Sequence, residues 1–299
     1  MSLPPKARKF MTRYREQGLQ SALIGAWSFV TNRACSRYES VVHPKVLKMR
    51  YRATYRGSYP AADKLIHVDP TEIDHVTFPN FTPRVPLEIP HVKEGDWDQN
   101  LSTECVMLTC HDQEITDTTL VELENYGLYR AFRAHFADGI PWRDTEFYQW
   151  ALAGGVSPKT PVMYSRYGTK ERMDTYFAKI DTLYDDIRSN GYLTQDEVGS
   201  KRNEATLHRE YDYRSNDEIC VNIGRDGAFF LDDGRHRFMI TRVLGLDSIP
   251  VKVLVRHKQW QSRRQDIHQS TGIDELSPRC REVLSHPDMN DVVPPSLKP

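Results

Sequence analysis

The segment 218–257 constrains the fold more than any other part of the chain. It reads EICVNIGRDGAFFLDDGRHRFMITRVLGLDSIPVKVLVRH. Two short runs of β-forming residues flank the RDG sequence at 225–227, which is typical of a hairpin turn. We expect a helix over 237–244, stopped by Gly245, and another strand after it. This order of two strands, a helix and a strand predicts an α/β fold of the α+β kind.

The rest of the chain adds elements of both kinds. A β-rich run at 65–68 leads into a one-turn helix that Asp69 is expected to cap. Apolar residues recur at helical spacing over 120–137 and 173–187, and another helix is expected within 140–152. Gly191 supplies the stop signal after 173–187, so we expect that helix to end there.

Composition is that of an ordinary globular protein. The 299 residues are 39% hydrophobic and 27% charged, and the five cysteines are scattered, as is typical of reduced thiols. No apolar run is long enough to span a membrane, and the first residues carry no cleavage signal of an exported protein. We therefore expect a cytoplasmic protein. The formal net charge of −1 gives no general attraction to nucleic acid.

The sequence DDGRHR at 232–237 joins the hairpin to the helix. A strand that turns at a glycine directly into a helix leaves backbone N–H groups of the first turn without partners, which favours an anion. The three basic side chains after the glycine add donors suited to phosphate oxygens. Asp233 can hold Mg²⁺ or accept a proton, and either acid can cap the helix. Alternatively, both acids only cap the helix and the arginines lie on a solvated face.

The DGRHR sequence at 233–237, entered from IGRDGAFFLD and followed by FMITRVLGLDSIPVKVL, resembles the D-G-x-H-R signature of the ParB and sulfiredoxin superfamily. IHVDPTEID is similar to the opening strand and turn of that superfamily, and IDTLYDDIRSNGYL to its helix before a glycine. The resemblance implies a ParB/sulfiredoxin-like domain at 64–264 with a helical insertion at about 101–170. A basic N-terminal extension, 1–63, would precede it and a loop-rich tail, 265–299, would follow.

Members of this superfamily bind nucleotide phosphates at the glycine loop but differ in chemistry. Sulfiredoxins need a cysteine just before the His-Arg pair, where this chain has Arg235. ParB proteins continue into a helix-turn-helix module and a dimerisation region, for which 265–299 offers little. The leading Asp is most similar to the free-serine-kinase branch. The resemblance therefore implies Mg²⁺-dependent phosphotransfer from ATP, ADP or CTP to a small hydroxyl-bearing acceptor.

The kinase interpretation assigns roles around the motif. In that branch an acid after the first strand acts as the base on the acceptor, and the acids available in this region are Glu88, Glu94, Asp96 and Asp98. The candidate catalytic residues are Asp233, His236, Glu94 and Asp96, with Asp233 also a possible Mg²⁺ ligand. The candidate phosphate-binding residues are Gly234, Arg235, His236 and Arg237. The identity of the base stays open among the acids.

Two other classes of function stay open. A regulator without catalysis would bind nucleotide, or nucleic acid through the segment RHKQWQSRRQ at 256–265. The nucleic-acid contacts would then be Arg256, Lys258, Arg263 and Arg264. The same segment also fits a solvated helix packed through Trp260. The third class is a structural or interaction protein that keeps the fold without the chemistry.

The N-terminal extension suggests a possible membrane contact. A helix expected over 19–38 carries Leu19, Leu23 and Trp27 at helical spacing. Lys6, Arg8, Lys9, Arg13 and Arg15 precede this stripe. The stripe either packs on the main domain or rests on an anionic membrane surface. Peripheral contact with a membrane is therefore an expected alternative to a purely cytoplasmic location.

Overall fold

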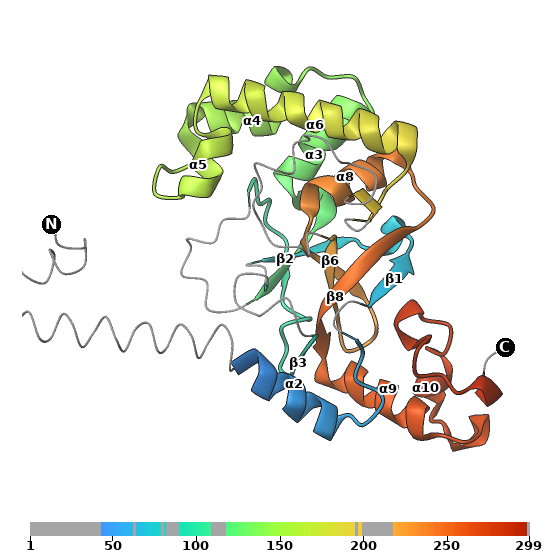
Figure 1. The fold of residues 1–299 in the computed structure, drawn as a ribbon. Helices are drawn as coiled ribbons and strands as arrows, with labels where there is room; N and C mark the ends of the chain where they lie inside the picture. The colour runs from blue at the N-terminus through green and yellow to red at the C-terminus, as the bar shows by residue number, and fades with distance from the viewer. Residues whose placement is uncertain are drawn as a thin grey trace, which may run out of the picture. The chain divides into compact units, whose positions relative to one another are not determined.

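The computed structural model describes residues 43–61, 64–78, 81, 90–108, 118–194, 197–198 and 218–297 (Figure 1). The chain divides into two compact units, Met1–Thr54 and Tyr55–Pro299. The described part of the first unit is the helix α2 (His43–Thr54). The helix expected over 19–38 lies outside the described residues. Residues 55–61 belong to the second unit, whereas we expected the N-terminal extension to run to residue 63.

The second unit is built on a mixed sheet. Within the described residues its strands are β1 (Leu65–Val68), β2 (His75–Phe78), β3 (His91–Lys93), β4 (Leu101–Ser102), β5 (Thr119–Glu122), β6 (Cys220–Ile223), β7 (Phe229–Asp233) and β8 (Ile249–His257). Their order is β1-β8-β6-β7-β2-β5-β4, and β3 pairs with the C-terminal part of β8. β6 and β7 form the expected antiparallel hairpin, whereas β8 runs parallel to β6 and β2 parallel to β7. The fold is therefore of the mixed α/β class.

Helices cover one face of this sheet beside β7 (Figure 1). This layer contains α3 (Gly127–Phe136), α4 (Glu146–Trp150), α5 (Pro161–Tyr167), α6 (Lys170–Asn190) and α8 (Arg235–Leu244), and α8 packs against α3 and α6. α9 (Lys258–Gln269) follows β8 directly and precedes α10 (Pro278–Arg281). Short 3-10 turns occupy Pro70–Glu72, Leu123–Asn125, Trp142–Asp144, Ile273–Glu275, Pro287–Met289 and Pro295–Leu297, and a π turn occupies Ala151–Gly155. None of the helices in the described ranges is both long and apolar enough to cross a bilayer.

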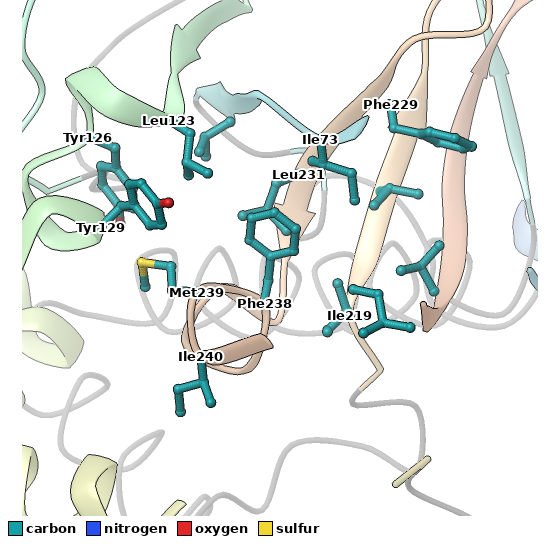
Figure 2. Close-up of a cluster of buried hydrophobic side chains, with 14 of the residues drawn as sticks. Ile73, Leu123, Tyr126, Tyr129, Ile219, Phe229, Leu231, Phe238, Met239 and Ile240 are labelled. Atoms are coloured by element: carbon teal, nitrogen blue, oxygen red, sulfur yellow. The ribbon is translucent and has the colours of Figure 1, made fainter. Parts of the chain in front are cut away.

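Alternation along β7 divides its side chains between two hydrophobic clusters. Leu231 faces the helical layer beside Phe238 of α8 (Figure 2), and Phe229 at the start of β7 stacks on the ring of His286 with the centroids 4.8 Å apart. Phe230 faces the opposite side and packs with Trp97 and other residues of a second cluster. Asp232 lies two residues after Phe230 and points to the same face as Phe230, where it is fully buried, whereas Asp233 at the end of β7 is half-buried. The two acids of the motif therefore lie in different surroundings.

Several local predictions are confirmed. Oδ1 of Asp69 accepts a hydrogen bond from the amide of Thr71 at 2.7 Å, as expected of a cap. α6 ends at Gly191, which has a φ of 74°, and α8 ends at Gly245, which is left-handed. Both glycines occupy backbone conformations that other residues rarely adopt.

The expectation of a helix over the whole of 120–137 is wrong. Leu120 and Val121 lie in β5 and pair with Thr77 and Val76 of β2, and α3 begins only at Gly127. A short continuous apolar run fits a strand as well as a helix, and here the pairing with β2 decides. The insertion expected to be helical at 101–170 therefore also contributes β4 and β5 to the sheet.

The C-terminal segment is packed into the second unit. Asp288 is completely buried and accepts hydrogen bonds from Nε and Nη2 of Arg256 at 2.9 and 2.6 Å and from Nε1 of Trp260 at 3.0 Å. Arg264 and Lys64 also form ion pairs with this carboxylate. Met289 is buried as well. The segment that we expected to be a loop-rich tail consists of short helical turns anchored by a buried carboxylate.

Candidate phosphate-binding site

The site is the turn between β7 and α8. Gly234 joins the two elements with a φ of 72° and a ψ of 23°. A Cβ atom added at this position would lie 2.7 Å from Cα of Ile219 and 3.2 Å from the carbonyl oxygen of Glu218. Both the left-handed backbone and the close approach of another strand therefore require glycine. The turn that the sequence predicted is present.

The N-terminus of α8 has no side-chain cap among the described residues. The first intrahelical bond runs from the amide of Phe238 to the carbonyl of Gly234 at 3.0 Å. Oδ1 of Asp233 accepts from the amide of Gly234 at 2.8 Å and so does not cap the helix. The N–H groups of 235–237 consequently form the positive end of the helix, which favours an anion.

Arg235 ties the ends of two parallel strands together. Its Nε donates to the carbonyl of Asp232 and its Nη2 to the carbonyl of Thr77, both at 3.2 Å. Its guanidinium also lies over the ring of Tyr126, 5.9 Å from the centroid. Part of the hydrogen-bonding capacity of Arg235 therefore serves the fold, although its charge remains beside the turn.

Arg237 has a hydrogen-bond donor that no described residue uses. Its Nη1 is buried and has no hydrogen-bond partner among the described residues. Tyr192 donates to Oε2 of Glu218 at 3.3 Å, and the pKa of Tyr192 is raised by its burial and by Glu218 and is lowered in part by Arg237. Glu218 and Arg237 therefore lie in one electrostatic environment. A buried guanidinium N–H without an acceptor costs stability. Nη1 of Arg242 and Nη1 of Arg256 share this property, but Arg237 differs from them because it lies in the first turn of a helix without a side-chain cap.

Asp232 supports the turn from the other face of the sheet. It is completely buried, and its Oδ2 accepts from the amide of Phe81 and from Nδ2 of Asn222, both at 2.8 Å. Nδ2 of Asn222 also donates to the hydroxyl of Thr77 at 3.0 Å. Asp232 thus neither caps α8 nor faces solvent, because the alternation along β7 directs it into a buried polar network.

His236 is a half-buried hydrogen-bonding group in contact with the helical layer. The hydroxyl of Tyr167 lies 3.0 Å from Nε2 of His236, and the hydroxyl of Tyr176 lies 3.3 Å from the same atom. Burial and the charges of Arg166, Arg235 and Arg237 lower the pKa of His236 to about 3. The imidazole is therefore neutral near pH 7. It can exchange hydrogen bonds but does not add the positive charge that the sequence suggested.

Sequence reasoning missed the contribution of the helical insertion to the site. Tyr167 and Arg166 come from α5 and Tyr176 from α6, and the guanidinium of Arg166 lies 5.6 Å from the ring centroid of Tyr176. Nothing in the sequence marks these residues, because only the packing of α5 and α6 against α8 brings them to His236. Glu218 was also missed, although its position just before β6 places it across from the turn.

Glu94 and Asp96 do not lie at this site. Glu94 pairs with Lys258 at 2.7 Å, and Asp96 pairs with Arg225 at 2.7 Å. Arg225 lies in the hairpin turn before β7, whereas Asp233 is the last residue of that strand. At about 3.3 Å per residue, the two ends of β7 are roughly 13 Å apart.

The pairing of β3 explains this separation. β3 runs parallel to β8 and delivers the following residues to the C-terminal end of β8, beside the hairpin turn. Asp98, which we also considered, is bound there by the amide and Nε of Arg225. Glu88 lies outside the described residues. Of the acids considered that the structure describes, Asp233 alone lies at the turn.

The four expected nucleic-acid contacts do not form a basic surface. Arg256 and Arg264 are 2% and 0% exposed and pair with the buried Asp288. Arg263 is largely buried and pairs with Asp226. Lys258 is exposed but pairs with Glu94. The alternative of a solvated helix packed through Trp260 is confirmed only for the aromatic residue, because Trp260 of α9 is fully buried but Arg256 and Arg264 are buried as well.

Asp233, the predicted Mg²⁺ ligand, lies at the turn. No three His, Cys, Asp or Glu side chains cluster as metal ligands within the described part of the chain. Mg²⁺ is commonly bound by one or two carboxylates together with substrate phosphates and water. The half-buried Asp233 fits that requirement. The amide of Gly234 donates to Oδ1 of Asp233, and Oδ2 is the oxygen that would bind the ion.

No family model, curated protein or solved structure matches this chain. The assignment to the ParB and sulfiredoxin superfamily therefore stays a prediction based on the motif at 233–237 and the order of elements around it.

Proposed function

We propose that the protein binds the phosphate groups of a nucleotide at the first turn of α8. The observation that carries the proposal is the buried Nη1 of Arg237, which has no acceptor among the described residues, at a helix N-terminus without a side-chain cap. A phosphate oxygen would satisfy this donor and would accept from the amides of 235–237. Arg235 and Arg166 add positive charge around the same turn.

We further propose phosphotransfer from ATP, ADP or CTP to a small hydroxyl-bearing molecule. Asp233 supports this step because it is half-buried at the turn and its described hydrogen bond engages Oδ1 alone. The acceptor oxygen would attack the terminal phosphorus, the bond from phosphorus to the bridging oxygen would break, and the hydroxyl proton would pass to the carboxylate of Asp233. Mg²⁺, where bound by Asp233 and the phosphates, would neutralise negative charge.

The arginines and the imidazole would have separate tasks. Arg235 is held by the carbonyls of Asp232 and Thr77, so its guanidinium is fixed before a ligand arrives. Such preorganised charge lowers the energy of a transition state without reorganisation. His236 is neutral and contacts Tyr167, so it would orient groups by hydrogen bonding.

A second candidate is a nucleotide-binding regulator without catalysis. It is favoured by the positions of Glu94 and Asp96, which are paired at the opposite end of β7 and cannot act as a base at the turn. A regulator would need the phosphate site but no base. Product analysis separates the two candidates, because only the kinase converts the nucleotide in the presence of an acceptor.

Calorimetric titration of ATP, ADP and CTP with Mg²⁺ tests the binding site. Arg237→Gln should weaken binding by about tenfold or more, the loss expected for one charge-assisted hydrogen bond. Arg242→Gln is the matched control, because Nη1 of Arg242 is also buried without a partner among the described residues but lies near the other end of α8, where Arg242 pairs with Asp74. Equal affinities for the wild type and Arg237→Gln would refute the site.

Asp233→Asn tests the transfer step. The variant should keep the nucleotide affinity within a few fold and lose conversion of nucleotide in the presence of hydroxyl-bearing acceptors such as free amino acids, sugars and nucleosides. Binding without conversion in both the wild type and Asp233→Asn would favour the regulator. Unchanged conversion by Asp233→Asn would exclude Asp233 as the base.

A further inference from the structure

α2 carries an exposed apolar stripe. Val46 and Met49 are 50% and 71% exposed, and Ala53 is also exposed. The spacing of three and then four residues places all three side chains on one face of a helix. Val46 and Met49 are the large apolar side chains of this helix that are exposed. Their alignment on one face indicates a surface that contacts an apolar partner.

Basic side chains border the stripe on both sides. At 100° per residue, Lys45, Lys48 and Arg52 fall on one side of the stripe and Arg50 on the other. The twelve residues of α2 include no Asp or Glu. Long Lys and Arg side chains can extend away from an apolar surface to place their charges among anionic groups. The helix thus combines a narrow apolar face with basic side chains on both sides of it.

Charge is also unevenly distributed along the chain. Residues 1–56 contain 12 Lys and Arg but only 2 Glu, whereas the whole chain has a formal net charge of −1. Residues 57–299 therefore carry a clear net negative charge. An anionic surface would repel residues 57–299 and attract residues 1–56. The N-terminal residues would therefore be the ones that contact such a surface.

We propose that α2 binds the surface of an anionic membrane, with Val46, Met49 and Ala53 inserted at the level of the lipid headgroups. The stripe favours a membrane over nucleic acid. Contacts to a nucleic-acid backbone need cations, and single strands stack on aromatic rings. Val, Met and Ala offer no such ring and gain only from an apolar environment.

The basic side chains of α2 agree with a helix that lies in the plane of the membrane, because Lys45, Lys48, Arg50 and Arg52 would be costly to place in the hydrocarbon core. Amphipathic helices of this kind bind through buried apolar area together with attraction to anionic lipids. Each of these two contributions is modest here, so binding is reversible and needs both.

The test is co-sedimentation of the full chain with vesicles of phosphatidylcholine alone and of phosphatidylcholine mixed with phosphatidylserine. The wild type should bind only the anionic vesicles. The double variant Val46→Ser/Met49→Ser, which keeps every charge, should bind about tenfold more weakly because it loses the buried apolar area. The double variant Lys45→Gln/Lys48→Gln should also bind more weakly and should be less sensitive to salt.

Leu152→Ser is the matched control, because Leu152 is 50% exposed on the π turn of the second unit. It should bind like the wild type, and circular dichroism should show equal helix content in all variants. Equal binding to both vesicle types would overturn the proposal. So would full binding by Val46→Ser/Met49→Ser, since the attraction would then be only electrostatic. If duplex DNA displaces the protein from vesicles, and the wild type and Val46→Ser/Met49→Ser bind this DNA equally well, α2 would be assigned to nucleic acid instead.

Discussion

The hydroxyl of Tyr167 lies 3.0 Å from Nε2 of His236, and this contact joins α5 of the insertion to the first turn of α8. The motif at 233–237 therefore contacts side chains of the insertion. Its histidine is held neutral by its burial and by three nearby arginines, one of which, Arg166, also comes from α5. The insertion completes the environment of the turn as well as extending the sheet.

Acidification should weaken the contribution of His236 to stability. An unfolded chain protonates this histidine as the pH falls through its ordinary pKa of 6.5, whereas the folded protein protonates it only near pH 3. Between these values the unfolded state binds more protons, so stability that is complete above pH 6.5 is lost toward pH 3. Urea unfolding at pH 7.5 and pH 5 should show that the wild type loses more stability than His236→Gln. An equal loss in both proteins would contradict the low pKa.

Arg166 should contribute to nucleotide binding from outside the motif. Arg166→Gln should reduce the affinity for ATP with Mg²⁺ by about tenfold, because one of three converging charges is lost. The control is Arg172→Gln, since Arg172 lies over the ring of Tyr164 at 5.1 Å rather than beside His236. The melting temperatures of both variants should match the wild type. An affinity unchanged by Arg166→Gln would restrict the site to 233–237.

Gly234 and Gly245, which lie at the two ends of α8, should differ in how well they tolerate substitution by alanine. Both have a positive φ, but a Cβ at Gly234 would meet the backbone of Ile219 whereas a Cβ at Gly245 would meet nothing within 4 Å. Gly245→Ala should cost about 1 kcal/mol of the free energy of unfolding for the left-handed backbone. Gly234→Ala should cost about 3 kcal/mol or more and displace the turn. Chemical denaturation measures both, and equal losses would show that the close approach at Gly234 is relaxed in solution.

Removal of the buried charge of Asp288 should destabilise the second unit. Asp288→Asn leaves Arg256 and Arg264 without their common carboxylate in the core, and the expected loss is about 3–5 kcal/mol of the free energy of unfolding. Asp291→Asn is the control, because the side chain of Asp291 is 34% exposed and its pairs with Lys64 and Arg264 are partly solvated. It should cost about 1 kcal/mol or less. Equal losses would mean that water reaches Asp288.

Local sequence signals were sufficient to predict the turns and helix ends near the site. The hairpin at 225–227, the stop at Gly245 and the cap at Asp69 depend on a few neighbouring residues and could be predicted from them. The location of Glu94 and Asp96 could not, because it depends on the parallel pairing of β3 with β8. Pairing between distant strands leaves no mark in the sequence of either strand.

The buried polar residues show the same limit. Arg256 and Arg264 read as a basic surface because charge in a sequence suggests solvent, and only the return of Asp288 makes their burial possible. Asp232 was likewise considered as a cap of the helix, although the alternation along β7 places it beside Asn222. Such residues need partners from distant segments, so their role becomes visible only in the structure.

The central claim is that phosphate groups bind at the N-terminus of α8, and amide chemical shifts test it most directly. A titration with ATP and Mg²⁺, followed in ¹⁵N-labelled protein, should give the largest shifts at the amides of Arg235, His236 and Arg237. The amides of Lys258 and Arg263 should stay almost unchanged. Saturable shifts at 235–237 that Arg237→Gln reduces would support the account. Shifts confined to other residues, or none at any nucleotide concentration, would contradict it.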